Sequence, residues 1–200
     1  MLVAAPAPTR PNWMEIDLLA LDQNYRELTS RLEPGTRLIA SVKGNAYGLG
    51  MSEIARRLVA LGAHALTTGS FEDALAIRQT GLDATEIVMF GGALPAAMPA
   101  YLREGLIPTI HNWELAEAVS AAARKPAKVY IKVDCGHGRL GLPLKTAVEF
   151  ILRVAGLPRV AVEGIYTHLP FTDAEGLEWA GARLQLSEIG SPCRAEMRTC

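Results

Sequence analysis

The sequence predicts an α/β protein built on a parallel sheet, and three observations lead to that prediction. Short runs rich in β-branched residues alternate with runs whose apolar residues recur at helical spacing. The connections are short, and Gly or Pro residues mark their ends. The strand-then-helix unit repeats about six times, which implies parallel strands joined by right-handed crossovers.

The expected elements follow one another through most of the chain. Asp17 and Ser70 are N-cap residues for two of the helices, and Asp73 stands three residues after Ser70. The expected strands are residues 13–16, 37–42, 65–68, 86–90, 107–110, 128–133 and 160–168. The expected helices are residues 18–32, 51–61, 70–79, 95–104, 112–123, 143–155 and 174–186, with a glycine loop at 48–50.

Two architectures fit this alternation, an open doubly wound sheet and a (β/α)₈ barrel. No GxGxxG string follows the first buried strand, so a dinucleotide-binding sheet has little support. A closed barrel takes about 250 residues, and six units are too few to close one.

Composition and charge exclude several classes of function. The net charge of −1 gives no basic excess for nucleic acid. No apolar run approaches the ~18 residues that span a membrane, and residues 1–12, expected as a flexible leader, lack the basic start of a signal peptide. Cys135, Cys193 and Cys200 form no CxxC pair, so neither a disulfide framework nor a zinc site is predicted. We expect a soluble cytoplasmic protein.

Lys43 is the first candidate for chemistry, because it ends an otherwise apolar strand. In parallel α/β folds the C-terminal ends of strands bear the catalytic groups, and a lysine amine there can attack an aldehyde. Glycines in the residues that follow allow the backbone to approach a ligand closely. The alternative is a lysine that leaves its strand and reaches into water.

Two further candidate site residues follow other expected strands. Arg139 lies in a glycine-rich turn, where a guanidinium can grip a carboxylate in a bidentate fork. His168 ends the last expected strand. The alternatives are a solvated loop arginine and a core histidine bonded to a backbone carbonyl. Lys43, Arg139 and His168 all fall at strand C-termini, as one pocket requires. Cys135 and His137 are two metal ligands at most, too few for a site.

These segments resemble the motifs of alanine racemases. KGNAYGLG at 43–50 is similar to K-A-N-A-Y-G-H-G, KVDCGHGRLG at 132–141 to K-V-D-T-G-M-G-R-L-G, and GIYTH at 164–168 to G-[IL]-[FYM]-[ST]-H. WMEIDL at 13–18 is a weaker match to the family's opening strand. The resemblance covers about residues 12–186, and the departures are Gly44, Leu49, Cys135 and His137.

The resemblance implies pyridoxal 5′-phosphate (PLP) as cofactor. Lys43 would bind PLP covalently and act as one catalytic base, Tyr47 would contact the phosphate, and His168 would lie against the ring. Arg139 would approach the substrate carboxylate and the cofactor's phenolic oxygen. Lys132 corresponds to a lysine that is carbamylated in many members and positions this arginine. The implied partners are a small amino acid and a second copy of the enzyme.

The resemblance also implies an incomplete (β/α)₈ barrel over residues 13–186, lacking the family's C-terminal β-domain and followed by an atypical tail at 187–200. The expected activity is interconversion of L- and D-alanine, with no second base found in these residues; Tyr166 is expected to point away from His168. The alternatives are a PLP-binding carrier protein on the same barrel, a decarboxylase or aldolase on that barrel, and a non-functional fragment.

Overall fold

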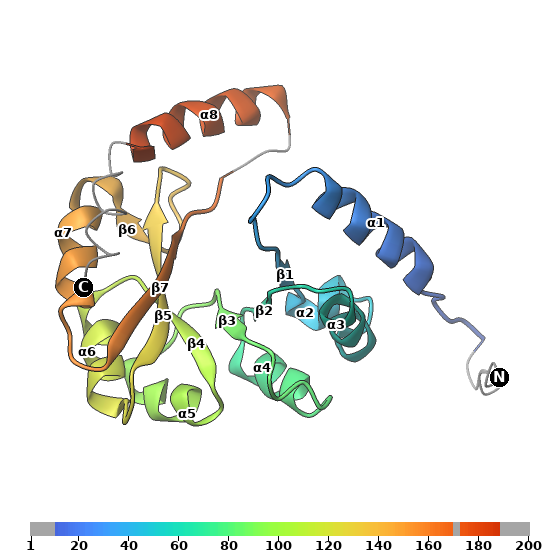
Figure 1. The fold of residues 1–200 in the computed structure, drawn as a ribbon, viewed down its shortest axis with the longest axis horizontal. Helices are drawn as coiled ribbons and strands as arrows, with labels where there is room; N and C mark the ends of the chain where they lie inside the picture. Colours follow the sequence, from blue (N-terminus) through green and yellow to red (C-terminus); the bar gives the residue numbers. More distant parts are fainter. Residues whose placement is uncertain (1–10, 170–172, 189–200) are drawn as a thin grey trace.

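A curved parallel sheet forms the centre of the computed structural model, which describes residues 11–169 and 173–188 (Figure 1). The pairing order is β1-β2-β3-β4-β5-β6, and β7 also pairs with β5. Every pairing is parallel, as the alternation of strands and helices predicts. The strands are β1 (Ile39–Ser41), β2 (Ala65–Thr68), β3 (Ile87–Met89), β4 (Leu106–Ile110), β5 (Ala127–Asp134), β6 (Leu142–Pro143) and β7 (Val160–Tyr166).

Helices follow the strands and cover the outer side of this arc (Figure 1). The predicted N-caps are confirmed: the Asp17 carboxylate accepts from the Leu19 and Ala20 amides, and the Ser70 hydroxyl accepts from the Asp73 amide. The helices are α1 (Leu18–Ser30), α2 (Lys43–Tyr47), α3 (Met51–Ala60), α4 (Phe71–Arg78), the 3₁₀ turn η1 (Pro95–Ala97), α5 (Met98–Arg103), α6 (Trp113–Ala122), α7 (Leu144–Ala155) and α8 (Ala174–Glu188).

The sheet has two buried faces, because side chains alternate along each strand. The outer face packs against the helices in one large cluster, with Leu66, Ile87, Ile110, Val129 and Ile131 among its fully buried members. The inner face has a smaller cluster of Ala65, Val88, Ile107 and Tyr130, joined by Ile39, Phe90 and Tyr166. Polar groups on the inner face therefore lie on the concave side of the arc.

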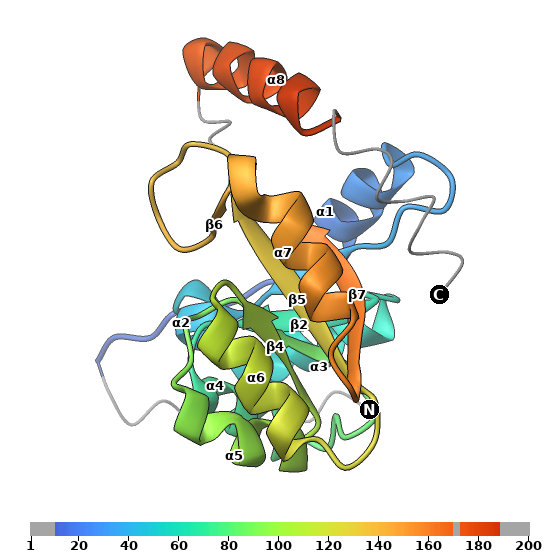
Figure 2. The same cartoon turned by 90° about the vertical axis from the view of Figure 1, so that its left-hand side faces the viewer.

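The barrel is incomplete, as predicted. Within the described residues β1 pairs only with β2, and β7 only with β5, so these two strands are open edges. All the strands run the same way, so their C-terminal ends share one side of the sheet. In Figure 2, α8 lies beyond the end of the sheet at which β6 is found.

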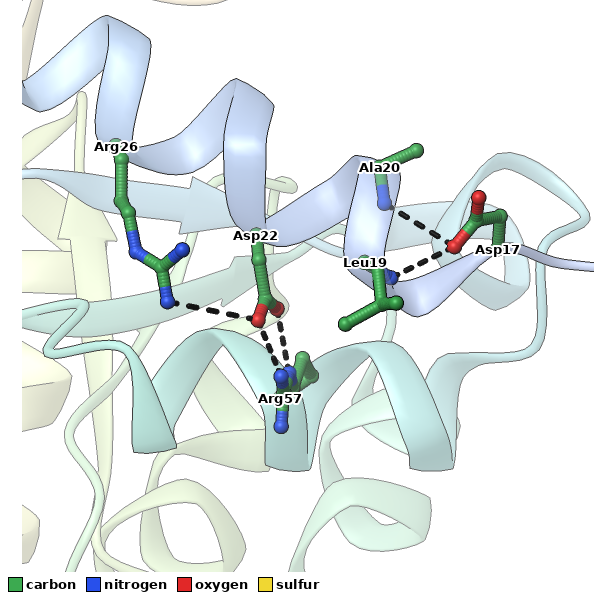
Figure 3. A network of polar contacts seen from close by, with 6 residues as sticks. All are labelled: Asp17, Leu19, Ala20, Asp22, Arg26 and Arg57. Atoms are coloured by element: carbon green, nitrogen blue, oxygen red, sulfur yellow. Dashed lines mark hydrogen bonds and ion pairs between the residues drawn. The ribbon is translucent and has the colours of Figure 1, made fainter.

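A polar link ties the first helix to the rest of the fold (Figure 3). Asp22 of α1 is buried, and its two oxygens accept a bidentate pair of hydrogen bonds from Arg57 of α3. Arg26 lies 3.7 Å from the same carboxylate. The bond from Arg57 lowers the pKa of Asp22 below its ordinary value, although burial opposes it. Asp22 thus has the partners that a buried carboxylate requires.

Some expectations fail or fall outside the described residues. Residues 13–16, expected as a strand, form none: Trp13 and Met14 are each 64% exposed, and no described strand lies beside them to accept pairing. Most of the expected leader and tail, with Cys193 and Cys200, lies outside the described residues. None of the described helices combines the length and the apolar character needed to cross a bilayer.

Candidate active site

Lys43 lies just after the C-terminal end of β1, at the inner side of the sheet. Val42 is fully buried against the helices, whereas Ser41 and Lys43 on either side of it are exposed. Alternation along β1 places Ser41 away from the helix layer, and the charge of Lys43 acts on Lys132 of the inner face. The Lys43 amine is accessible from the concave side.

The chain after Lys43 forms a single left-handed helical turn, which the sequence did not predict. Gly44, Asn45, Ala46 and Tyr47 have φ values of 59°, 56°, 54° and 56°. A left-handed conformation costs a residue with a Cβ roughly 1–2 kcal/mol, so the three residues after Gly44 need outside support. The turn brings the Tyr47 ring centroid to 5.7 Å from Lys43 Nζ, and the Tyr47 hydroxyl donates to Ser41 Oγ at 3.3 Å.

Lys132 is the buried cation of the site. It lies on the inner face of β5, is 5% exposed, and its Nζ is 5.7 Å from the centre of the Tyr166 ring. Burial lowers the pKa of Lys132 below its ordinary value; Arg139 and Lys43 lower it further, and Asp134 opposes them. The charges of Arg139 and Lys43 thus act on Lys132 from the ends of β5 and β1.

The loop after β5 presents Arg139. The Asp134 carboxylate folds the loop by accepting the amides of Gly136 at 2.9 Å and Gly138 at 3.0 Å. Burial would raise the pKa of Asp134, but these N–H donors lower it below its ordinary value. Gly141 has a φ of 146°, and a Cβ there would stand 2.8 Å from the Asp134 backbone nitrogen. Arg139 itself is exposed beside the site.

His168 follows β7 and meets a residue that the sequence did not connect with it. Its ring centroid lies 4.9 Å from that of His137, in an edge-to-face arrangement. Burial lowers the pKa of His168, and the charges of Arg139 and His137 lower it further. The loop that presents Arg139 thus also contacts the end of β7.

Tyr166 lies on the inner face, and the expectation that it points away from the site is wrong. Its ring stacks on Phe90 at 4.5 Å, its hydroxyl is 3.1 Å from Thr109 Oγ1, and Lys132 Nζ lies over it. Tyr166 ends β7 and His168 lies two residues beyond it, and the charge of Arg139 acts on both side chains. Burial raises the pKa of Tyr166.

Sequence reasoning missed His111, which follows β4. Its Nδ1 is buried without a hydrogen-bond partner in the described structure. Burial lowers the pKa of His111, the nearby Thr109 backbone opposes this shift, and the charge of Lys132 lowers the pKa again. The signal available in the sequence was its position directly after the buried strand β4, on the side of the sheet where His168 follows β7.

The charge of this region fits a ligand with an aldehyde and a phosphate. The side chains of Lys43, Lys132 and Arg139 form no hydrogen bond or ion pair with another described residue. The carboxylate beside them, Asp134, is engaged by loop amides. An accessible amine can take an aldehyde, and uncompensated cations can hold phosphate or carboxylate oxygens.

A metal ion does not fit the same region. Among the described residues, no three His, Cys, Asp or Glu side chains are grouped so that they could hold one. Cys135, the cysteine next to His137 in this loop, is a buried free thiol.

Comparison with known proteins places the chain in the family of alanine racemase N-terminal domains. The family described as alanine racemase, N-terminal domain, matches residues 16–191. The alanine racemase of Syntrophobacter fumaroxidans is 36% identical over 181 residues, which cover 89% of this chain and 48% of that protein. The chain therefore spans about half the length of the curated relatives that it matches.

Solved structures show the same fold. An alanine racemase from Clostridium difficile 630 superposes with a TM-score of 0.87 at 24% identity, over 95% of this chain and 53% of that one. An alanine racemase from Bartonella henselae, solved with covalently bound pyridoxal phosphate, gives a TM-score of 0.74 at 26% identity, over 87% of this chain and 52% of that one.

Proposed function

Because the chain belongs to the family of alanine racemase N-terminal domains, we propose that it forms the PLP-binding half of an alanine racemase. The observation that supports this best is that parallel strands place Lys43, Lys132 and Arg139 at the same side of the sheet, without ion-pair partners in the described structure. An exposed amine can take the aldehyde of such a cofactor, and a guanidinium beside it can hold a carboxylate.

Each side chain has a proposed role at the cofactor or the substrate. Lys43 Nζ is the point of attachment for PLP, and it takes or returns the α-proton on one face of the amino acid. Tyr47, with its hydroxyl beside Ser41, holds phosphate oxygens. Arg139 grips the substrate carboxylate, and His168 borders the cofactor ring. When bound, PLP supplies an electron sink that stabilises negative charge at the α-carbon.

We propose that Lys132 is carbamylated. Its lowered pKa favours the neutral amine, the form that reacts with carbon dioxide to give a carbamate and release a proton. The product would replace a buried, unpaired cation by an anion beside Arg139, whose guanidinium it would orient. Intact-mass measurement with and without bicarbonate, on the chain and on Lys132→Met, tests this role: the added mass should be absent from the variant.

Racemisation needs a second acid–base group on the opposite face of the substrate. We assign that group to the part of the relatives' length that this chain does not span, and to a second subunit, as the family resemblance implies. Tyr166 is a poor substitute, because its hydroxyl is engaged with Thr109 and burial raises its pKa.

A PLP titration followed by visible absorbance tests the proposal. The wild-type chain should develop the absorbance of a lysine-bound cofactor, and Lys43→Ala should not. Lys125→Ala is the matched control, because Lys125 is an exposed lysine at the other end of the sheet, just before β5. A spectrum that survives in Lys43→Ala and vanishes in Lys125→Ala would contradict the proposal.

A further inference from the structure

The left-handed turn at Gly44–Tyr47 needs support from outside its own sequence. Neither Asn45 nor Ala46 is a glycine, yet both have positive φ values near 55°. The far end of the turn is held by the Asn45 side chain, whose Oδ1 accepts the Met51 amide at 2.8 Å. Ala46 is buried beneath the turn. What holds the near end, next to Lys43, determines where Lys43 points.

Asp73 of α4 holds that near end. Its Oδ2 accepts the amide of Gly44 at 3.3 Å and the hydroxyl of Thr68 at 2.9 Å. Thr68 ends β2 and is 1% exposed, so one anchor of the carboxylate is fixed in the sheet. The Asp73 amide is itself capped by Ser70 Oγ at 3.1 Å. A single carboxylate therefore ties the C-terminal end of β2 to the residue that follows Lys43.

We propose that Asp73 is a positioning residue, which fixes the left-handed turn and so directs the Lys43 amine toward PLP. The inference rests on the proposed function, because it assigns Asp73 a part in cofactor capture through Lys43. Asp73 need not touch the cofactor. It acts through the Gly44 amide, one peptide unit from Lys43, and its removal would free the turn to relax to an unstrained conformation.

Two variants of the full chain separate positioning from general stability. Asp73→Ala removes the acceptor, whereas Asp73→Asn keeps an oxygen that can accept from both Gly44 and Thr68. Asp17→Ala is the matched control, because it removes another helix-capping carboxylate, whose hydrogen bonds go to the Leu19 and Ala20 amides of α1 and not to the turn. The readouts are amide hydrogen exchange over residues 44–47 without cofactor, and PLP binding by absorbance.

Loss of a hydrogen bond to a charged acceptor should be visible in both readouts. We expect Asp73→Ala to speed exchange over the turn and to weaken PLP binding by about tenfold each, with Asp73→Asn close to wild type. Asp17→Ala should lower the melting temperature while leaving both readouts unchanged.

Two results would overturn parts of the account separately. If Asp73→Ala and Asp17→Ala showed the same hydrogen-exchange rates over the turn and the same affinity for PLP, the role proposed for Asp73 would be wrong. A wild-type chain that takes up no PLP would contradict the proposed function instead, and the exchange readout would still decide whether Asp73 holds the turn.

Discussion

The two ends of the sheet use the same kinds of charged residue in opposite ways. At the N-terminal ends of the strands, Arg78 donates to four backbone carbonyls that precede β3 and β4, Arg159 donates to the Ser120 carbonyl, and Lys128 pairs with Glu86. At the C-terminal ends, the side chains of Lys43, Lys132 and Arg139 have no hydrogen-bond or ion-pair partner in the described structure. The cations that stabilise the first end are bonded to the protein, whereas the end where chemistry is expected contains a buried cation without a partner among the described residues, Lys132.

Open space does not distinguish the two ends. A cavity of about 1110 Å³ lies at the N-terminal ends, lined by Arg78, Glu104 and Lys128 among others. Arg78 and Lys128 have protein partners, and the unpaired cations of the lining, Arg124 and Lys125, are exposed, whereas the region around Lys43 contains a buried cation without a partner in the described part of the chain, Lys132. Chemistry is therefore assigned from the charges and their partners, and not from volume.

The largest predicted effect concerns the second acid–base group. Residues 1–200 alone should racemise alanine about 10²–10⁴-fold more slowly than the same residues joined to the C-terminal half of a related alanine racemase, because one general base is lacking. The measurement is the rate of D-alanine formation with saturating PLP. Equal rates would show that a second base lies within this chain.

Arg78→Ala should be the most damaging change at the N-terminal ends of the strands, which form the stable end of the sheet. It leaves several backbone carbonyls without their donor and should lower the free energy of unfolding by about 2–3 kcal/mol. Urea unfolding measures this loss. Arg103→Ala is the control, because Arg103 is exposed and pairs only with its neighbour Glu104, so its loss should cost at most about 1 kcal/mol. Equal losses of unfolding free energy in Arg78→Ala and Arg103→Ala would contradict the structural role assigned to Arg78.

Arg139→Lys should affect chemistry and leave stability unchanged. In residues 1–200 joined to the C-terminal half of a related alanine racemase, loss of the bidentate fork should lower kcat/KM for alanine by about tenfold or more. Arg124→Lys, an exposed site at the stable end, should have no effect. Unchanged kinetics in Arg139→Lys would make Arg139 an ordinary surface residue.

Lys132→Met should stabilise the chain slightly, by about 1 kcal/mol near neutral pH and without carbon dioxide, because it removes a buried charge that lacks a partner. Burial lowers the pKa of Lys132 in the folded state, so its charge destabilises the fold below that pKa. The difference between variant and wild type should shrink as pH rises toward the ordinary lysine value of about 10.4. Unfolding at several pH values measures it, and a difference that grows with pH would contradict the assignment.

Much of the site could be predicted from strand ends. Lys43, Arg139 and His168 each follow an expected strand, and parallel strands bring such ends to one side of the sheet. The N-caps Asp17 and Ser70 were predictable for a similar reason, because a capping residue acts within its own helix turn.

Features that depend on distant contacts could not be predicted. Nothing local requires Ala46 to take a positive φ, since the turn is tied to Asp73, 29 residues beyond Gly44. Residues 13–16 have a strand pattern but no described partner strand. The error at Tyr166 is different: the pattern contained the answer, because residues 166 and 168 share a face of the expected strand 160–168.

The most direct test of the central claim is to identify the lysine that takes PLP. The wild-type chain is incubated with PLP, reduced with borohydride and digested, and the labelled peptide is sequenced by mass spectrometry. The account predicts a label on Lys43, within the peptide that contains the left-handed turn. A label confined to another lysine, such as Lys125 or Lys128 at the stable end, would contradict it.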